Sequence, residues 1–569
     1  MFGVKKMSLF LVLIHSFPCL LALDIVPDDL QIKLDNGILQ GNKKYMKNGK
    51  TYFNFQGIPY AVPPLGKLRF KDPIPYKKWT GILNATQFGS NCVEMRLRQM
   101  TYTIIGQEDC LYLNVYTPQN PHAIRKLLPV MVWVYGGFFR EGSASFYGPD
   151  YLMNESVLIV TFNYRTGFFG FLSTQDNIAP GNYGLKDVVL ALKWVKKNII
   201  KFGGDGNKIT VFGESAGAAM IGYMLISRQS RNLFHAAIME SGTPLCPWAL
   251  HRNARKVAFD LGVALGLTTN SSSTLIRFLQ SQDLLKSSSH MIRVNLLNFI
   301  EVFDNGGPFG PVIEPESNQA FLTKDSFRAF QKGDFQRIPV IVGMNSQESK
   351  YLNSLLPSTR PILFLYDVSP SSLARTAMNV KYPRNKSIVG AKIKQFYFKY
   401  NSFIRGTDAE FAEYFSDDLF VRPITKTAQL MSKYIPVYFY VYDFEGAMGK
   451  LWLEFGSAEN NNVKGVAHAT ELWYLWKAGW TKQTFQNTEE ELTSERLVKL
   501  WTNFATYGNP TPEPQSSLQN LKWPKVQTFD QEYLYIGKAL KVDRNFKKAS
   551  IQFWDNLYRN YSNGPFETY

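Results

Sequence analysis

Histidine and cysteine are scarce in this chain, which contains six histidines and four cysteines among 569 residues. The spacings typical of zinc and dithiol sites, His-x-x-x-His and Cys-x-x-Cys, do not occur. The sequence therefore implies no metal ion and no organic cofactor. Because there are so few histidines, each can be weighed individually as a candidate for proton transfer.

Long apolar runs are confined to the first 23 residues. Lys5 and Lys6 precede an apolar run at 9–14 that continues to Leu23, a pattern typical of a signal peptide cleaved near Ala22 or Leu23. A signal anchor is the alternative, but the run is short for a membrane span. The last seven residues form neither a lipid-anchor tail nor a retention signal. We therefore expect a secreted protein without a stable membrane anchor.

Linkers, repeats and low-complexity stretches are also missing, although a chain of this length would ordinarily suggest about four domains. The motifs of one candidate site, described below, extend from position 108 to position 468. We therefore predict a single α/β domain over residues 24–569. Mixed, irregular segments at about 250–330 and 355–435 are expected to be helical cap insertions.

Acidic residues are outnumbered, since 63 Lys and Arg face 46 Asp and Glu, for a formal charge of +17. The basic residues are spread along the chain, as at Lys193, Lys196 and Lys197, which is typical of solvated helix faces. Specific nucleic-acid binding is therefore not expected. A weak attraction to anionic glycans or membranes stays open.

The strongest positive signal is the segment Ile-Thr-Val-Phe-Gly-Glu-Ser-Ala-Gly at 209–217. Residues 209–212 suit a buried strand, and the small residues from Ala216 suit a tightly packed helix start. Between them, Gly-x-Ser-x-Gly predicts a nucleophile elbow that presents Ser215 at a helix N-terminus. Chance alone would supply ~0.2 such pentapeptides in a chain of this length, so the strand-to-helix context carries the prediction.

A serine needs a base to remove its proton and an acid to orient that base. In α/β-hydrolases the base follows the nucleophile in the chain, which excludes the two histidines before Ser215. His235 lies in an apolar segment and is interpreted as packing or an exposed helix position. His251 and His290 have polar, positively charged neighbours and are expected at the solvated surface. His468, in a Gly-containing loop after a predicted core strand at 437–441, is the expected base.

The candidate acid is Glu348, which follows an apolar strand predicted at 338–343. The carboxyl ends of strands are where α/β sheets place their sites. An acidic residue at a strand end is nevertheless most often a surface charge, so this assignment needs independent support.

That support is a family resemblance. Residues 202–217 resemble the serine signature of the carboxylesterase/cholinesterase family (type B carboxylesterases), and residues 108–118 are similar to its second signature. The resemblance covers nearly all of the chain after residue 23 and is closest to secreted insect esterases. It implies an α/β-hydrolase fold, with a central, mostly parallel sheet flanked by helices and a helical cap. Further similar segments are 56–61, 163–165, 181–187, 501–505 and 508–510.

The resemblance also implies roles for single residues. It makes Ser215 the nucleophile, His468 the base and Glu348 the acid, because 343–348 matches the family's Gly-x-Asn-x-x-Glu. The chain order derived above agrees. Ser241 is either an accessory residue of the site or a structural turn serine.

Cysteine use follows from the same resemblance, which pairs Cys92 with Cys110. Closing that loop would stabilise the fold by about 3 kcal/mol. Cys19 leaves with the signal peptide, and Cys246 is expected to be a small buried residue. Five Asn-x-Ser/Thr sequons are candidates for glycosylation of an exported protein: Asn84, Asn154, Asn270, Asn385 and Asn560.

The oxyanion loop departs from the family's pattern. There, a strand ends in an aromatic residue and three small residues, usually Gly-Gly-Gly; here Gly136 and Gly137 are followed by Phe138. The backbone N–H groups of Gly137, Phe138 and Ala216 are the expected donors to the oxyanion. A benzyl group has less backbone freedom than glycine and can take up space for the acyl group. Since one lost donor costs ~3 kcal/mol, we expect a narrowed or slow site.

The expected function is a secreted serine esterase that hydrolyses uncharged carboxylic esters through an acyl-enzyme. The loop at 93–109 lacks the cation-binding Trp of cholinesterases and contains Arg96 and Arg98, which disfavours choline esters. Insect juvenile-hormone esterases commonly have Gln before the serine, whereas this chain has Glu214. The alternative, favoured by Phe138, is a weak or inactive family member that sequesters a ligand or serves in adhesion.

Overall fold

The computed structural model describes residues 30–46, 48–98, 101–283, 306–449, 463–479, 484–527, 530–564 and 566–569. The predicted signal peptide at 1–23 and His290 lie outside these residues. So does part of the loop that leads to His468.

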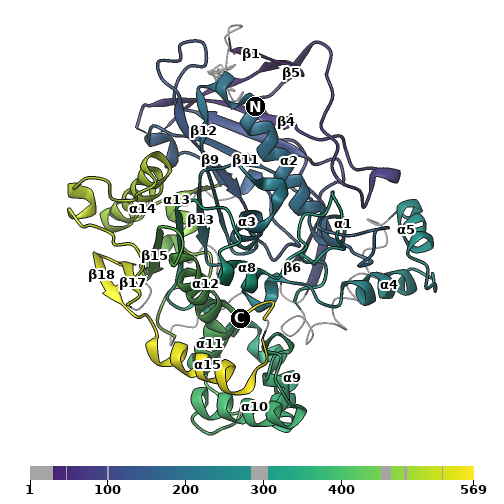
Figure 1. Cartoon of the computed structure of the whole chain (residues 1–569). Coiled ribbons are helices and arrows are strands. Elements are labelled where there is room, and N and C mark those ends of the chain that lie inside the picture. Colours follow the sequence, from purple (N-terminus) through teal and green to yellow (C-terminus); the bar gives the residue numbers. More distant parts are fainter. Residues whose placement is uncertain are drawn as a thin grey trace, which may run out of the picture.

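An eleven-stranded sheet forms the centre of the molecule, in the order β18-β17-β15-β14-β13-β12-β9-β11-β8-β4-β3 (Figure 1). Neighbouring strands are parallel from β11 through β17 and antiparallel at both ends of the sheet. The strands are β3 (Asn42–Tyr45), β4 (Thr51–Pro59), β8 (Tyr112–Thr117), β9 (Leu128–Val134), β11 (Leu158–Phe162), β12 (Gly204–Glu214), β13 (Ala236–Glu240), β14 (Val340–Asn345), β15 (Val437–Tyr442), β17 (Glu532–Ile536) and β18 (Leu540–Arg544).

Three central strands, β12, β14 and β15, match the apolar runs that predicted them. Every residue of β9, β11, β13, β14 and β15 is buried, as expected for parallel strands covered on both faces. Small two- and three-stranded sheets lie outside this core. They are formed by β1 (Gln31–Leu34), β2 (Gly37–Gln40) and β5 (Ile82–Asn84), by β6 (Glu94–Arg98) and β7 (Thr101–Ile105), and by β10 (Tyr147–Gly148) and β16 (Lys477–Ala478).

Helices cover the sheet and build the cap. One of them is α2 (Tyr183–Asn198), whose face at Val188, Leu192 and Val195 is fully buried. No helix among the described residues combines the length and the apolar character needed to cross a bilayer. The others are α1 (Gly167–Phe171), α3 (Ala216–Ile226), α4 (Ala254–Ala264), α5 (Ser272–Ser281), α8 (Ser326–Lys332), α9 (Leu356–Val368), α10 (Pro383–Tyr397), α11 (Asp408–Ser416), α12 (Arg422–Ser432), α13 (Leu472–Leu475), α14 (Thr488–Tyr507) and α15 (Lys548–Tyr561).

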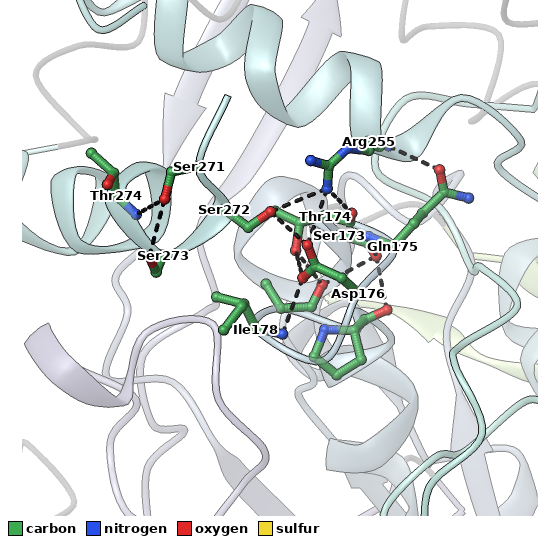
Figure 2. Close-up of polar contacts among 12 residues, drawn as sticks. Ser173, Thr174, Gln175, Asp176, Ile178, Arg255, Ser271, Ser272, Ser273 and Thr274 are labelled. Carbon is green, nitrogen blue, oxygen red and sulfur yellow. Dashed lines mark hydrogen bonds and ion pairs between the residues drawn. The ribbon is translucent and has the colours of Figure 1, made fainter. Parts of the chain in front are cut away.

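One cap insertion, α4 and α5, is tied to the core by a polar cluster around Asp176 (Figure 2). The Asp176 carboxylate accepts hydrogen bonds from the Thr174 and Ser272 hydroxyls, both at 2.6 Å, and from Arg255 at 3.1 Å. Ser271 caps the start of α5. The loop after α1 and the helices α4 and α5 therefore meet at one carboxylate. These bonds fix the position of the insertion relative to the loop.

The predicted disulfide is confirmed. Cys92 and Cys110 are bonded, with their Cα atoms 4.8 Å apart, and Cys246 is a buried free thiol. Of the five glycosylation candidates, all are exposed except Asn385, which is half-buried.

Candidate active site

The nucleophile elbow joins the end of β12 to the start of α3. Ser215 takes a left-handed conformation there, with φ 56° and ψ −121°. A side chain on Gly213 or Gly217 would lie 2.3 Å or 2.0 Å from the carbonyl oxygen of Val134, and one on Gly242 would lie 2.1 Å from that of Ser215. The glycines are therefore required because β9 and the loop after β13 press against the turn.

Ser215, His468 and Glu348 form one hydrogen-bonded line. His468 Nε2 lies 2.8 Å from Ser215 Oγ, and His468 Nδ1 lies 2.6 Å from Glu348 Oε2. Ser215 and His468 are each 8% exposed, and Glu348 is fully buried. This arrangement matches the nucleophile–base–acid geometry that activates a serine.

Asn345, at the end of β14, holds the acid and base loops together. Its backbone N–H donates to Glu348 Oε1 at 2.8 Å, and its amide nitrogen donates to the Ala467 carbonyl at 2.7 Å. The His468 N–H donates to the Glu348 carbonyl at 3.0 Å. The same Asn345 amide donates to Glu471 at 2.5 Å. The conformations of the two loops are therefore coupled through one side chain.

Glu214 is a second acidic neighbour of the imidazole, one that the sequence did not predict. Its Oε1 atom lies 3.0 Å from His468 Nε2, close enough for its charge to act on the imidazole. Gly136 makes room for this carboxylate, because a side chain there would lie 2.6 Å from Glu214 Oε2. Burial alone would lower the pKa of His468, but Glu214 and Glu348 outweigh it and raise that pKa well above its ordinary value.

Two further buried carboxyl groups lie behind the triad. Burial and the charges of Glu214 and Glu348 raise the pKa of Glu471 to about 8. Burial, with Glu471 nearby, raises the pKa of Glu240 well above its ordinary value, although Trp501 donates to it at 3.0 Å. Glu471 is therefore largely protonated at neutral pH, which limits the negative charge that the interior holds around His468.

The oxyanion loop follows β9. Gly137 and Phe138 have φ angles of 109° and 55°, and Phe139 continues in the same region at 61°. Positive φ is costly for a bulky residue. The Arg140 N–H donates to the Gly137 carbonyl at 3.0 Å, and the Gly167 N–H donates to the Phe139 carbonyl at 2.7 Å, which holds the loop in place.

The three expected donors to the oxyanion remain available. Among the described residues, the N–H groups of Gly137, Phe138 and Ala216 donate to no protein acceptor. A side chain on Gly136 would lie 2.9 Å from Ser215 Cβ, so this loop passes directly beside the nucleophile. The position of Ala216 at the start of α3 adds the helix dipole to the same place.

The Phe138 ring is packed against protein. Its centroid lies 6.2 Å from that of Trp248, and the Arg140 guanidinium sits 4.9 Å from it. The ring also occupies the space above Gly307, where a side chain would lie 2.5 Å from it. Phe138 therefore has the strained backbone conformation expected of it, and its side chain is held by contacts with Trp248, Arg140 and Gly307.

A π-helical turn, η10 (Asp417–Val421), brings an aromatic ring onto the imidazole. The Phe420 ring centroid lies 4.7 Å from His468 and 5.8 Å from Trp248. Asp418 anchors the turn by pairing with Arg375 at 2.6 Å and with Arg422 at 2.8 Å. Such turns are rare and often occur at functional sites. Phe420, Trp248 and Phe138 thus form a continuous aromatic wall from the base to the oxyanion loop.

The structure corrects the interpretation of His251 and leaves packing as the interpretation of His235. His251 is not at the solvated surface: it is 4% exposed, and burial beside Arg252 lowers its pKa to about 3. Its polar sequence neighbours do not reveal that the chain turns inward here, where its N–H donates to the Pro311 carbonyl. His235 precedes β13 as a half-buried bend residue and is not in a helix.

The structure also shows where Ser241 and Arg96 lie. Ser241 is a buried turn residue with φ 52°, and its hydroxyl has no hydrogen-bond partner among the described residues. Arg96 is paired with Glu94 at 2.7 Å, while the side chain of Arg98 lies outside the description. No cluster of three metal-binding side chains occurs in the described part of the chain.

Comparisons with known proteins agree with this geometry. The pattern of the carboxylesterase family matches residues 28–554. The chain is 34% identical to a juvenile hormone esterase of Tribolium castaneum, over 91% of this chain and 92% of that one. It is 31% identical to a carboxylic ester hydrolase of Bombus ignitus, over 93% and 94%.

A solved structure gives the same result for the fold. The juvenile hormone esterase of Manduca sexta, with OTFP covalently attached, superposes with a TM-score of 0.81 at 26% identity, over 93% of this chain and 99% of that one. The α/β-hydrolase fold expected from the sequence is therefore confirmed.

The raised pKa of His468 gives a prediction for the pH dependence. Only the unprotonated imidazole accepts the Ser215 proton, so kcat/KM should fall as pH drops through an apparent pKa above 6.5. Glu214→Gln removes one of the charges that raise this pKa and should move the acid limb down by about one pH unit.

Glu471→Gln is the matched control, because the Glu471 carboxyl is buried but does not contact the imidazole. The acid limb of this variant's pH profile should stay near that of the wild type. The measurement is the pH profile of kcat/KM for one ester. An unchanged acid limb in Glu214→Gln would refute the role assigned to Glu214.

Proposed function

Because the chain belongs to the carboxylesterase family and is a carboxylic ester hydrolase, we propose that it cleaves uncharged carboxylic esters with Ser215 as nucleophile, His468 as base and Glu348 as acid. The observation that carries this proposal is the position of His468, 2.8 Å from Ser215 Oγ and 2.6 Å from Glu348.

Acylation begins when Ser215 Oγ attacks the ester carbonyl and its proton passes to His468 Nε2. The carbonyl oxygen becomes an oxyanion, which the N–H groups of Gly137, Phe138 and Ala216 are placed to stabilise. When the tetrahedral intermediate collapses, the bond to the alcohol oxygen breaks. His468 returns the proton to that oxygen, and the alcohol leaves.

Deacylation repeats these steps with water. His468 removes a proton from the water, the hydroxide attacks the acyl-enzyme, and Ser215 leaves with the proton. Glu348 orients the imidazole in both half-reactions. Glu214, on the other side of the ring, stabilises the imidazolium that forms at each transition state.

Uncharged esters are the proposed substrates because apolar aromatic rings line the described wall beside the triad. The Arg96 charge is balanced by Glu94, and the aromatic wall of Phe138, Trp248 and Phe420 is apolar. Such a wall favours a short or flat acyl group. The natural ester is left open, since relatives named for different esters share this level of identity.

Secretion as a single domain from about residue 24 is part of the proposal. It is supported by the signal-like N-terminal sequence and by the Cys92–Cys110 disulfide, which needs an oxidising compartment to form. Glycosylation at the exposed sequons is a further expectation.

Hydrolysis of a short-chain nitrophenyl ester tests the chemistry. We expect sustained turnover by the wild type and a loss of at least about a thousandfold in Ser215→Ala, because the nucleophile is removed.

A single-turnover burst in the wild type would instead indicate an acyl-trapping protein. An undiminished rate in Ser215→Ala would contradict the proposed mechanism. Retained folding of the variant is checked by its thermal unfolding midpoint.

The aromatic wall predicts acyl-chain selectivity. Phe138→Gly removes the ring beside Trp248 and should raise kcat/KM for an octanoate relative to an acetate by about tenfold. Phe138→Leu keeps most of the bulk and should leave the ratio close to the wild-type value. If both variants leave the ratio unchanged, Phe138 does not bound the acyl site.

A further inference from the structure

The cap carries a stretch of chain that contains basic residues and no acidic ones. Between Asp367 and Asp408 the chain contains eight Lys or Arg residues and no Asp or Glu. Two of the eight are neutralised in the interior, Arg375 by Asp418 and Lys394 by Asp367. The other six, none paired with a carboxylate among the described residues, are Lys381, Arg384, Lys386, Lys392, Lys399 and Arg405.

Three carboxylates on the neighbouring elements already have other hydrogen-bond or ion-pair partners. Glu410 completes the capping box of α11 with Thr407 and also accepts from the Lys399 N–H. Asp417 and Glu413 pair with Lys547. The six cations are therefore not balanced by the helices packed around them.

Apolar side chains are exposed between these cations. Along α10, Arg384, Ile388, Lys392 and Phe396 follow one another at four-residue spacing on one exposed stripe, and exposed Tyr400 lies in the turn after the helix. Ile388 is 44%, Phe396 42% and Tyr400 62% exposed. The opposite side of the helix is fully or almost fully buried at Val389, Ile393 and Tyr397. A solvated helix face has no need of such aromatic residues.

The stripe borders a groove against α15. A hollow of about 410 Å³ is lined by Phe396 and Lys392 of α10 and by Phe553 and Leu557 of α15. The Phe396 and Phe553 rings stack with centroids 4.1 Å apart. Figure 1 places α10 at the end of the molecule farthest from β1 and β5, beside α15. Gln395, Asn556 and Asn560 also line the hollow, so the face combines cations, exposed apolar side chains and a groove of mixed polarity.

We propose that the α10 face, residues 381–405 with the adjoining surface of α15, binds the surface of an anionic phospholipid bilayer. Lys and Arg approach the anionic headgroups, while Ile388, Phe396 and Tyr400 enter the boundary of the acyl chains. A second copy of the chain is disfavoured, since its six cations would oppose these six. An anionic glycan would use the cations but leave the apolar side chains exposed. The inference does not depend on the proposed hydrolysis.

Two glycosylation candidates lie on this face, and they determine how the test is set up. Asn385 is on α10 and Asn560 lines the groove. A glycan at either position would hold a bilayer away.

The secreted protein is therefore compared with the same protein after enzymatic removal of N-glycans, each mixed with vesicles of phosphatidylcholine with or without phosphatidylserine. We expect the glycan-free form to sediment with the phosphatidylserine vesicles and to be released by salt.

Paired substitutions locate the contact. Lys392→Gln with Lys399→Gln should weaken vesicle binding about twentyfold or more, at roughly fivefold for each cation removed. The control, Lys193→Gln with Lys201→Gln, makes the same change in net charge on exposed residues elsewhere and should bind like the wild type. Tyr400→Ser should weaken binding without changing net charge. Hydrolysis of a water-soluble ester should be the same in all variants.

Three results would overturn the proposal. The first is failure of both glycoforms to bind phosphatidylserine vesicles. The second is an equal loss of binding in the α10 pair and the control pair, because net charge alone would then explain the attraction. The third is self-association that disappears in the α10 pair without any vesicle binding, because the face would then be a contact between copies of the chain.

Discussion

The structure depends on one line of hydrogen bonds, from Ser215 through His468 to Glu348, whose members are 253 and 120 residues apart along the chain. The parallel sheet makes this line attainable. Strands β12, β13, β14 and β15 run side by side in the same direction, so the loops at their carboxyl ends meet at one edge. Asn345 then fixes the acid loop to the base loop by bonding Glu348 and the Ala467 carbonyl.

Backbone strain gathers around the same line. Ser215, Phe138, Phe139, Ser241 and Ala469 all have positive φ, although none is glycine. Such conformations cost of order 1–3 kcal/mol each and persist only where the surroundings enforce them. Here a fully buried sheet edge, close glycine contacts and the aromatic wall enforce them. The site is thus held in shape before a substrate arrives, which is what oxyanion stabilisation requires.

The sequence predicted the parts of this site that have local signatures. The elbow, the strand that leads into it and the strands that precede Glu348 and His468 follow from short patterns, and all are present. The family resemblance supplied Glu348 and the Cys92–Cys110 pair, which local patterns left open. Glu214 beside His468 was not foreseen, because its side-chain direction depends on the loop at Gly136. The burial of His251 and the π-helical turn that carries Phe420 also depend on distant partners, and neither has a pattern of its own.

A crystal structure of the protein inhibited by a short-chain alkyl phosphonate ester tests the central claim most directly, because the adduct imitates the tetrahedral intermediate. We expect phosphorus bonded to Ser215 Oγ, with the phosphoryl oxygen about 3 Å from the backbone nitrogens of Gly137, Phe138 and Ala216. His468 should remain hydrogen-bonded to Glu348. A phosphoryl oxygen turned away from the Phe138 backbone, or an adduct on any other residue, would contradict the account.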